Sequence, residues 1–139
     1  MNGLRFFTFA GILLLLLWLV PGCGNGQQLV AISVVPTTET FGAANIPVSA
    51  NAGSQVQLKA LGSYIHPPVT KDITNQVTWT SNTPAMVTVS ATGLATATGH
   101  ACGSTLISAT VKTNNDGNEN APGAIVIGTM TANVVCSTT

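Results

Sequence analysis

The dominant pattern from Leu29 onward is an alternation of apolar and polar side chains. The stretch QVQLKAL places Val56 and Leu58 on one side and polar side chains on the other, and VTWTS does the same with Val77 and Trp79. A period of two is that of a β-strand with one buried face. We therefore expect Val56, Leu58, Val77 and Trp79 to lie in a hydrophobic core.

Turn-forming residues separate these stretches at short intervals, as in NAGS, HPP, SNTP, ATG and NNDGNENAPG. No stretch after Val20 shows an apolar period of 3.6 over a helical length. Short, regularly punctuated strands with one tryptophan on a central strand predict an all-β fold, a two-sheet β-sandwich of about seven strands. A single open sheet would leave one apolar face in water, and an OB-like barrel would need a basic, aromatic groove that this sequence lacks.

The N-terminal segment has a different pattern. Arg5 is followed by an uninterrupted apolar run from Phe6 to Val20 and then by Pro-Gly. One positive charge, an apolar run and a small residue before the break are the parts of a secretory signal, so we expect a signal helix here. The run gives about 22 Å of helix against a hydrocarbon core of about 30 Å. An uncleaved anchor lengthened by Leu4 stays open as an alternative.

The cysteine after this run bears on that choice. VPGC, residues 20–23, resembles the lipobox of bacterial lipoproteins, in which an apolar residue at −3 and Gly or Ala at −1 precede the acylated cysteine. Pro21 departs from the Ala, Ser or Thr that those proteins prefer at −2. The resemblance implies that Cys23 carries the lipid and becomes the new N-terminus. An ordinary signal cut nearby is a further alternative.

Several acyl chains on one cysteine anchor a protein stably, whereas a single chain does not. We expect the mature protein to be tethered to a membrane outside the cytoplasm through Cys23, with GNGQQ as a short flexible leash. Gly24 is not the Asp that retains enterobacterial lipoproteins on the inner membrane. In a cell with two membranes, the resemblance therefore implies the outer one.

The length of 139 residues fits one domain. We expect a signal peptide over 1–22, the lipidated cysteine and tether over 23–28, the sandwich over 29–136 and a tail over 137–139.

Charged residues make up only 6% of the chain, against roughly 25% in a typical domain. Beyond residue 22, positive and negative side chains nearly balance, which makes nucleic acid an improbable partner. They are Lys59, Lys71, Lys112, Glu39, Asp72, Asp116 and Glu119.

Two cysteines remain once Cys23 is assigned to lipid. Cys102 and Cys136 are expected to pair as a disulfide, because the space outside the cytoplasm is oxidising. The alternative, a metal held by two free thiols, lacks other ligands at suitable spacing.

Residues 72–110, DITNQVTWTSNTPAMVTVSATGLATATGHACGSTLISAT, carry a family resemblance. They are similar to the bacterial immunoglobulin-like domains of group 2, found in intimin-type surface proteins, through DIT..VTW.S, P..V.VS..GL.TA and G...I.A. AISVVP and QVQLKALGSY fit the family's first two strands. The resemblance covers about residues 29–136 and implies an immunoglobulin-like sandwich. It says little about function, since this fold serves many functions.

The chain departs from the family pattern at two places. Residues 39–53 lengthen the link between the first two strands, and we expect them to form an extra edge strand or a surface flap. Cys102 and Cys136 are additional, at the open ends of two equally long hairpin strands. If Ile107 and Met130 both point inward, alternation places Cys102 on the outward face of its strand and Cys136 on the inward face of its strand, so the two cysteines have opposite parity. A bulge is then expected at Gly103 or Gly128.

Candidate catalytic groups are few. His66 and His100 are expected in surface loops, with a shared metal site as the alternative, and Asp72 is expected to hydrogen-bond a turn rather than act as a general acid. NNDGNE, residues 114–119, is expected to be a hairpin turn, because it lacks the spaced glutamate of a calcium loop. No serine lies in a GxSxG turn. We expect no catalytic residues, no metal and no cofactor.

These observations favour a non-enzymatic, lipid-anchored envelope protein whose single immunoglobulin-like domain acts in adhesion or as a spacer or scaffold, with the membrane and an unknown protein or glycan as partners. The alternative is a carbohydrate- or peptide-binding accessory lipoprotein. For Trp79 itself, the alternative to a core position is a sugar-stacking platform.

Overall fold

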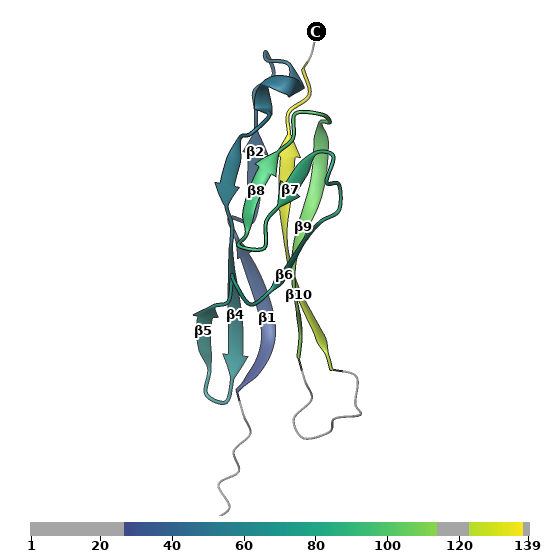
Figure 1. The fold of residues 1–139 in the computed structure, drawn as a ribbon. Helices are drawn as coiled ribbons and strands as arrows, with labels where there is room; N and C mark the ends of the chain where they lie inside the picture. Colours follow the sequence, from purple (N-terminus) through teal and green to yellow (C-terminus); the bar gives the residue numbers. More distant parts are fainter. Residues whose placement is uncertain (1–26, 114–122, 138–139) are drawn as a thin grey trace, which may run out of the picture.

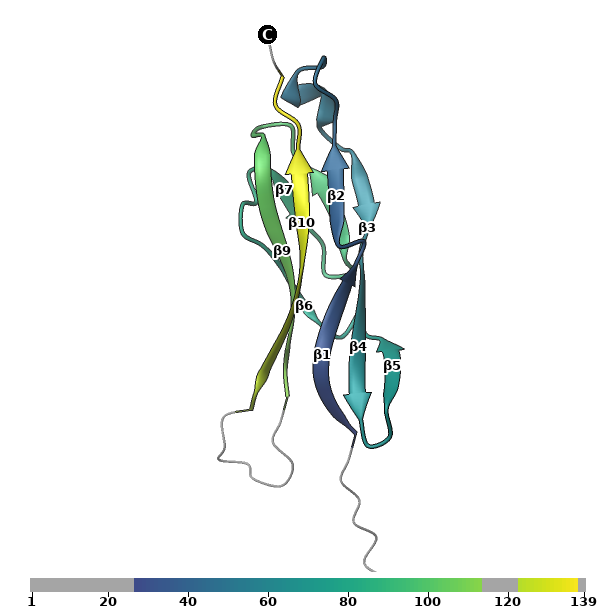
Figure 2. The same ribbon diagram turned by 180° about the vertical axis from the view of Figure 1, so that it is seen from behind.

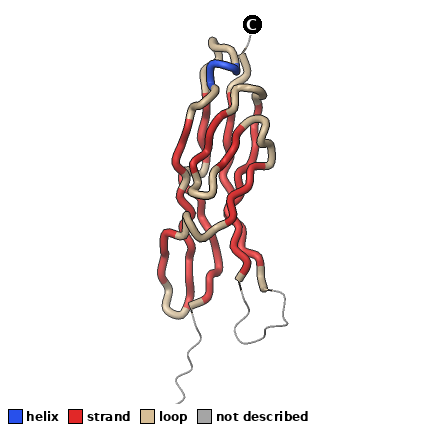
Figure 3. Tube along the Cα trace, viewed as in Figure 1, coloured by secondary structure: helices blue, strands red, loops and turns tan. Residues whose placement is uncertain are grey.

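The structure, a computed structural model, describes residues 27–113 and 123–137 and is all-β (Figure 1). Figure 3 shows one short helical turn, η2 (Val48–Asn51), at the end of the molecule where the described chain finishes. Among the described residues no helix is long and apolar enough to cross a membrane. The strands are β1 (Gln28–Val35), β2 (Thr38–Phe41), β3 (Gln55–Gln57), β4 (Lys59–Ile65), β5 (Val69–Asp72), β6 (Thr78–Ser81), β7 (Val87–Val89), β8 (Leu94–Ala97), β9 (Gly103–Lys112) and β10 (Ile125–Val134).

The strands form two layers. One layer is a four-stranded sheet in the order β2-β10-β9-β6, and the other consists of two three-stranded sheets, β1-β4-β5 and β3-β8-β7. Figures 1 and 2 show β7 and β8 in front of β9 and β10 from one side and behind them from the other. The expected β-sandwich is therefore confirmed.

The described residues form ten strands, whereas about seven were expected, because two long runs are interrupted. At Leu58 the backbone leaves the ladder, and the Leu58 N–H donates to the Gly93 carbonyl at 2.8 Å, so one run becomes β3 and β4. At Pro36 the chain ends β1, which pairs with β4, and passes into β2, which pairs in parallel with β10. The turn at His66–Pro68 adds the hairpin strand β5.

The long link between the first two strands contains both expected features. Its first part lies in β2, an edge strand, and its later part forms the η2 turn. Asn51 at the end of η2 is only 2% exposed. A Cβ atom on Gly42, whose φ is +92°, would lie 2.4 Å from the Asn51 amide nitrogen. A glycine is therefore required where β2 turns into this segment.

The β9–β10 hairpin corrects one expectation. Its register is continuous from the Gly103–Val134 pair to the Lys112–Ile125 pair, so neither strand contains the expected bulge. The inward positions include Ile107 and Met130, as the alternation predicted. The parity problem disappears because Cys102 precedes Gly103, the first residue of β9, whose φ is +124°, and Cys136 follows the end of β10, so both cysteines lie outside the ladder.

The core combines larger apolar side chains with several alanines. Leu58, Val77 and Trp79 are buried and Val56 packs against them partly buried. Gly128 illustrates how closely the layers approach, since a Cβ atom there would lie 2.5 Å from the Ile32 carbonyl oxygen of β1. Five alanines are almost completely buried: Ala60, Ala95, Ala97, Ala109 and Ala132.

Cys102 and Cys136 form a disulfide, as predicted, with a sequence separation of 34 and a Cα–Cα distance of 5.1 Å. The bond joins the start of β9 to the segment after β10. Closing a loop of this length stabilises the folded state by about 3.8 kcal/mol in the chain-entropy model. That is a large share of the net stability of a typical domain.

We expect the double variant Cys102→Ala/Cys136→Ala to lower the free energy of unfolding by about 2–4 kcal/mol, because the unfolded chain regains the entropy of the open loop. Urea unfolding of the variant and of the oxidised parent measures the difference. Equal midpoints for the two proteins would contradict the prediction.

Candidate functional site

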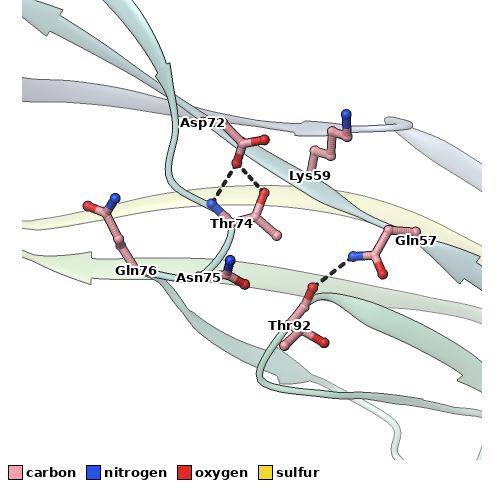
Figure 4. A pocket seen from close by; sticks show the side chains of 7 residues that line it. All are labelled: Gln57, Lys59, Asp72, Thr74, Asn75, Gln76 and Thr92. Carbon is pink, nitrogen blue, oxygen red and sulfur yellow. Dashed lines mark hydrogen bonds between the residues drawn. The ribbon is translucent and has the colours of Figure 1, made fainter.

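A polar hollow of about 490 Å³ opens on the surface where three segments meet: the break between β3 and β4, the turn after β5 and the turn before β8 (Figure 4). The lining combines a carboxylate, an ammonium group, amides and hydroxyls. The lining residues are Gln57, Lys59, Asp72, Thr74, Asn75, Gln76 and Thr92.

One wall of the pocket is a turn held by Asp72. The backbone N–H of Thr74 donates to Asp72 Oδ1 at 3.0 Å, and the Thr74 hydroxyl donates to the same oxygen at 2.6 Å. The hydroxyl bond first and the backbone bond second lower the pKa of the Asp72 carboxyl, and the charge of Lys59 adds a smaller effect in the same direction. Asp72 is therefore an ionised acceptor at neutral pH, in the turn-bonding role that the sequence predicted.

Thr74 also connects this wall to the core. Its Oγ1 accepts a hydrogen bond from the Ala60 N–H of β4 at 3.0 Å, and its carbonyl accepts one from Trp79 Nε1 at 3.0 Å. Thr74 and Trp79 are each 9% exposed. The turn is thus fixed to β4 and β6 by buried hydrogen bonds, which makes the wall rigid.

The opposite wall is held by Gln57. Its Nε2 donates to the Thr92 carbonyl at 2.7 Å and to the Leu58 carbonyl at 2.9 Å. The turn that contains Thr92 ends at Gly93, where φ is +79° and a Cβ atom would lie 2.9 Å from the Leu58 carbonyl oxygen and 3.1 Å from Trp79 Cζ2. Glycine is needed here for the turn and for the close approach of the indole.

Three of the lining side chains make no hydrogen bond to the rest of the lining. Figure 4 shows Lys59, Asn75 and Gln76 without a hydrogen bond to any other lining residue. An ammonium donor and two amides beside an ionised carboxylate match a neutral or zwitterionic ligand rich in hydroxyl or amide groups. The pocket is open and polar, so such a ligand would be held by hydrogen bonds rather than by apolar burial.

A family model for the bacterial Ig-like domain (group 2) matches residues 46–121. The chain belongs to this family. Comparison with curated proteins found no match. The matched range runs from the segment before β3 to beyond the end of β9, and β1, β2 and β10 complete the Ig-like sandwich on either side of it. Domains of this family are typical of surface and adhesion proteins, which fits a place outside the cytoplasm.

The Ig-like fold separates the two histidines of the sequence analysis. His66 lies in the turn between β4 and β5, and His100 lies before β9 near the disulfide, at the other end of the molecule (Figure 1). Within the described ranges, no group of three or more His, Cys, Asp or Glu side chains is placed to hold a metal ion. Cys23 and the NNDGNE segment lie outside the described residues.

Sequence reasoning named Asp72 but missed the rest of the pocket. In the sequence, the pocket is indicated only by the polar positions of QVQLKAL, because Gln57 and Lys59 point away from the core. Thr92 joins them through the Gln57–Thr92 and Leu58–Gly93 hydrogen bonds, which no local pattern indicates.

Asp72 makes the stability of the Ig-like domain sensitive to low pH. The pKa of the Asp72 carboxyl is lower in the folded state than in the unfolded chain. Its contribution to the free energy of unfolding is therefore fully present above the ordinary carboxyl pKa and is lost as the pH falls through the pKa of the folded state. We expect the parent to lose more stability than Asp72→Asn between neutral pH and about pH 3. Urea midpoints at both pH values measure this.

Two substitutions at Thr74 provide the controls. Thr74→Ser keeps the hydroxyl and should retain the acid dependence of the parent, whereas Thr74→Val removes the hydroxyl and should weaken it. An identical acid dependence in the parent and in Asp72→Asn would show that the Thr74 bonds do not govern the ionisation of Asp72.

Proposed function

We propose that the protein is a non-enzymatic lipoprotein of the bacterial cell envelope, whose single Ig-like domain acts in adhesion or as a spacer or scaffold. The observation that carries this proposal is the combination of a group 2 Ig-like domain with a lipobox-like cysteine, Cys23, only four positions before Gln27, the first described residue. A signal, an acylated cysteine and a surface-type module together make a tethered display unit. Gly24 favours the outer membrane where there are two.

The arrangement of the ends supports display. β1 begins at one end of the elongated domain, beside the β4–β5 turn, and the described chain finishes at the opposite end with the disulfide and η2 (Figures 1 and 2). A tether that holds the β1 end at the membrane would direct the other end outward. The loops around η2 and the disulfide would then meet partners first.

The chemistry of the pocket supports a non-catalytic role. A general acid needs a carboxyl with a raised pKa, and the pKa of Asp72 is lowered. The carboxylate oxygen that Thr74 holds is already used to stabilise a turn. The pocket is therefore suited to binding or to surface hydration, and a lipid-anchored binder of carbohydrate or peptide is the second candidate function, favoured by the polar groups of Lys59, Asn75 and Gln76.

Replacing Cys23 tests the anchor. We expect Cys23→Ser to stay at the precursor mass and to incorporate no labelled palmitate, because no thiol remains for acylation before cleavage. The control variant Cys102→Ser/Cys136→Ser keeps Cys23 and should be labelled like the parent. Labelling of Cys23→Ser at the parental level would exclude the proposed anchor.

A glycan array probed with the full protein separates the two candidate functions. The leading proposal predicts no saturable glycan binding. The second candidate predicts binding that Lys59→Ala and Asn75→Ala remove. Lys112→Ala deletes the same charge outside the pocket and is the matched control, so equal effects of Lys59→Ala and Lys112→Ala would argue against binding in the pocket.

A further inference from the structure

Exposed aliphatic side chains concentrate at the end of the domain where β1 begins. Ile125 and Ile127 of β10 are 63% and 57% exposed, the highest values among the exposed large apolar residues of the described chain. Val30 of β1 and Val69 of β5, which are 47% and 37% exposed, lie at the same end of the domain, in the other layer of the sandwich. We call these four residues the basal patch.

The patch interrupts a hydroxyl-rich surface. The next outward positions along β10 are Thr129 and Thr131, and their neighbours on β9 include Ser108 and Leu106. Leu106 stands alone there, and single exposed aliphatic residues are common on soluble surfaces. Ile125 and Ile127 occupy two successive outward positions at the end of the β9–β10 ladder, where hydroxyl side chains would be better hydrated. A partner that covers the two isoleucines explains their exposure better.

The tether leaves the domain at the same end. Lys71 Nζ of β5 donates a hydrogen bond to Gln27 Oε1, and it lies 5.0 Å from the centroid of the Tyr64 ring. These contacts fix the start of the described chain beside the β4–β5 hairpin. Cys23 is four positions away, a separation that an extended chain spans with at most about 14 Å.

A tether this short brings the basal patch within reach of the bilayer surface. If Cys23 carries acyl chains, as the proposed function holds, the basal end lies within about 14 Å of the lipid that anchors it. The headgroup region of one leaflet is itself about 5–8 Å thick. The isoleucines are therefore presented to the bilayer surface at high effective concentration, so a weak contact is enough to keep them there.

We propose that the basal patch docks on the lipid bilayer, with Ile125 and Ile127 inserted among the headgroups and the long axis of the domain held away from the membrane. This inference rests on the proposed lipid anchor. Docking through aliphatic side chains is apolar and does not require anionic lipid.

The test uses tryptophan as a depth probe in the full protein, purified from bacterial membranes and reconstituted in phosphatidylcholine vesicles with acyl chains brominated near the headgroup. The native Trp79 is 9% exposed and serves as the background. Ile127→Trp places the probe in the patch. Ile46→Trp, at an exposed aliphatic position near η2 at the far end, is the matched control.

We expect brominated lipid to reduce the emission of Ile127→Trp and to leave that of Ile46→Trp unchanged. Adding Ile125→Ser to Ile127→Trp should lower the ratio of docked to undocked domain by about tenfold, because one partly buried isoleucine side chain is lost. Circular dichroism and the absence of free thiol at Cys102 and Cys136 report that each variant is folded.

Quenching of Ile127→Trp no greater than that of Ile46→Trp would overturn the proposal. If the emission of Ile127→Trp changes with the amount of protein per vesicle and not with brominated lipid, the patch mediates contact between copies of the protein. That result would also overturn the proposal. The intact mass of each sample reports the anchor separately. Acylated Cys23 without quenching rejects docking alone, whereas unacylated Cys23 rejects the anchor and the docking that rests on it.

Discussion

The hydrogen bond from Trp79 Nε1 to the Thr74 carbonyl is the interaction on which the rest of the domain depends. It ties β6, which is an edge strand although the sequence predicted a central one, to the turn after β5. The hydroxyl of the same threonine joins that turn to β4 and to Asp72. On its other side the indole lies close to the turn at Gly93, and the Gly93 carbonyl holds Leu58 at the break between β3 and β4. One aromatic ring therefore sets the junction between the two half-sheets and both walls of the pocket.

The buried alanines of the core make this junction more important. Alanines and close glycine contacts bring the layers together but bury little apolar area, so hydrophobic stabilisation is modest at these positions. Three buried polar atoms, in Asn51, Ser81 and Thr105, have no hydrogen-bond partner among the described residues. Such groups weaken a fold. The disulfide and the bonds around Thr74 offset that weakness.

The sequence was informative wherever a local pattern decides the outcome. Alternation predicted the inward faces of the strands and the burial of Trp79, and cysteine counting predicted the disulfide. The bulge was wrong because the parity argument placed Cys102 and Cys136 inside the ladder, whereas both lie beyond it. The pocket was missed because it depends on a tertiary contact between Leu58 and Gly93. The exposed Ile125 was hidden within an apolar run whose register only the pairing with Lys112 reveals.

The parallel pairing of β2 with β10 has a mechanical consequence. The chain enters β2 from the end where β1 begins and leaves β10 at the opposite end, so a pull between the two termini draws these strands past each other. The bonds from Thr131 N–H to the Thr37 carbonyl and from Val135 N–H to the Phe41 carbonyl, at 2.9 and 3.0 Å, then carry the force together in shear. An edge strand of four residues thereby acts as a clamp, because its bonds must break at once rather than one after another.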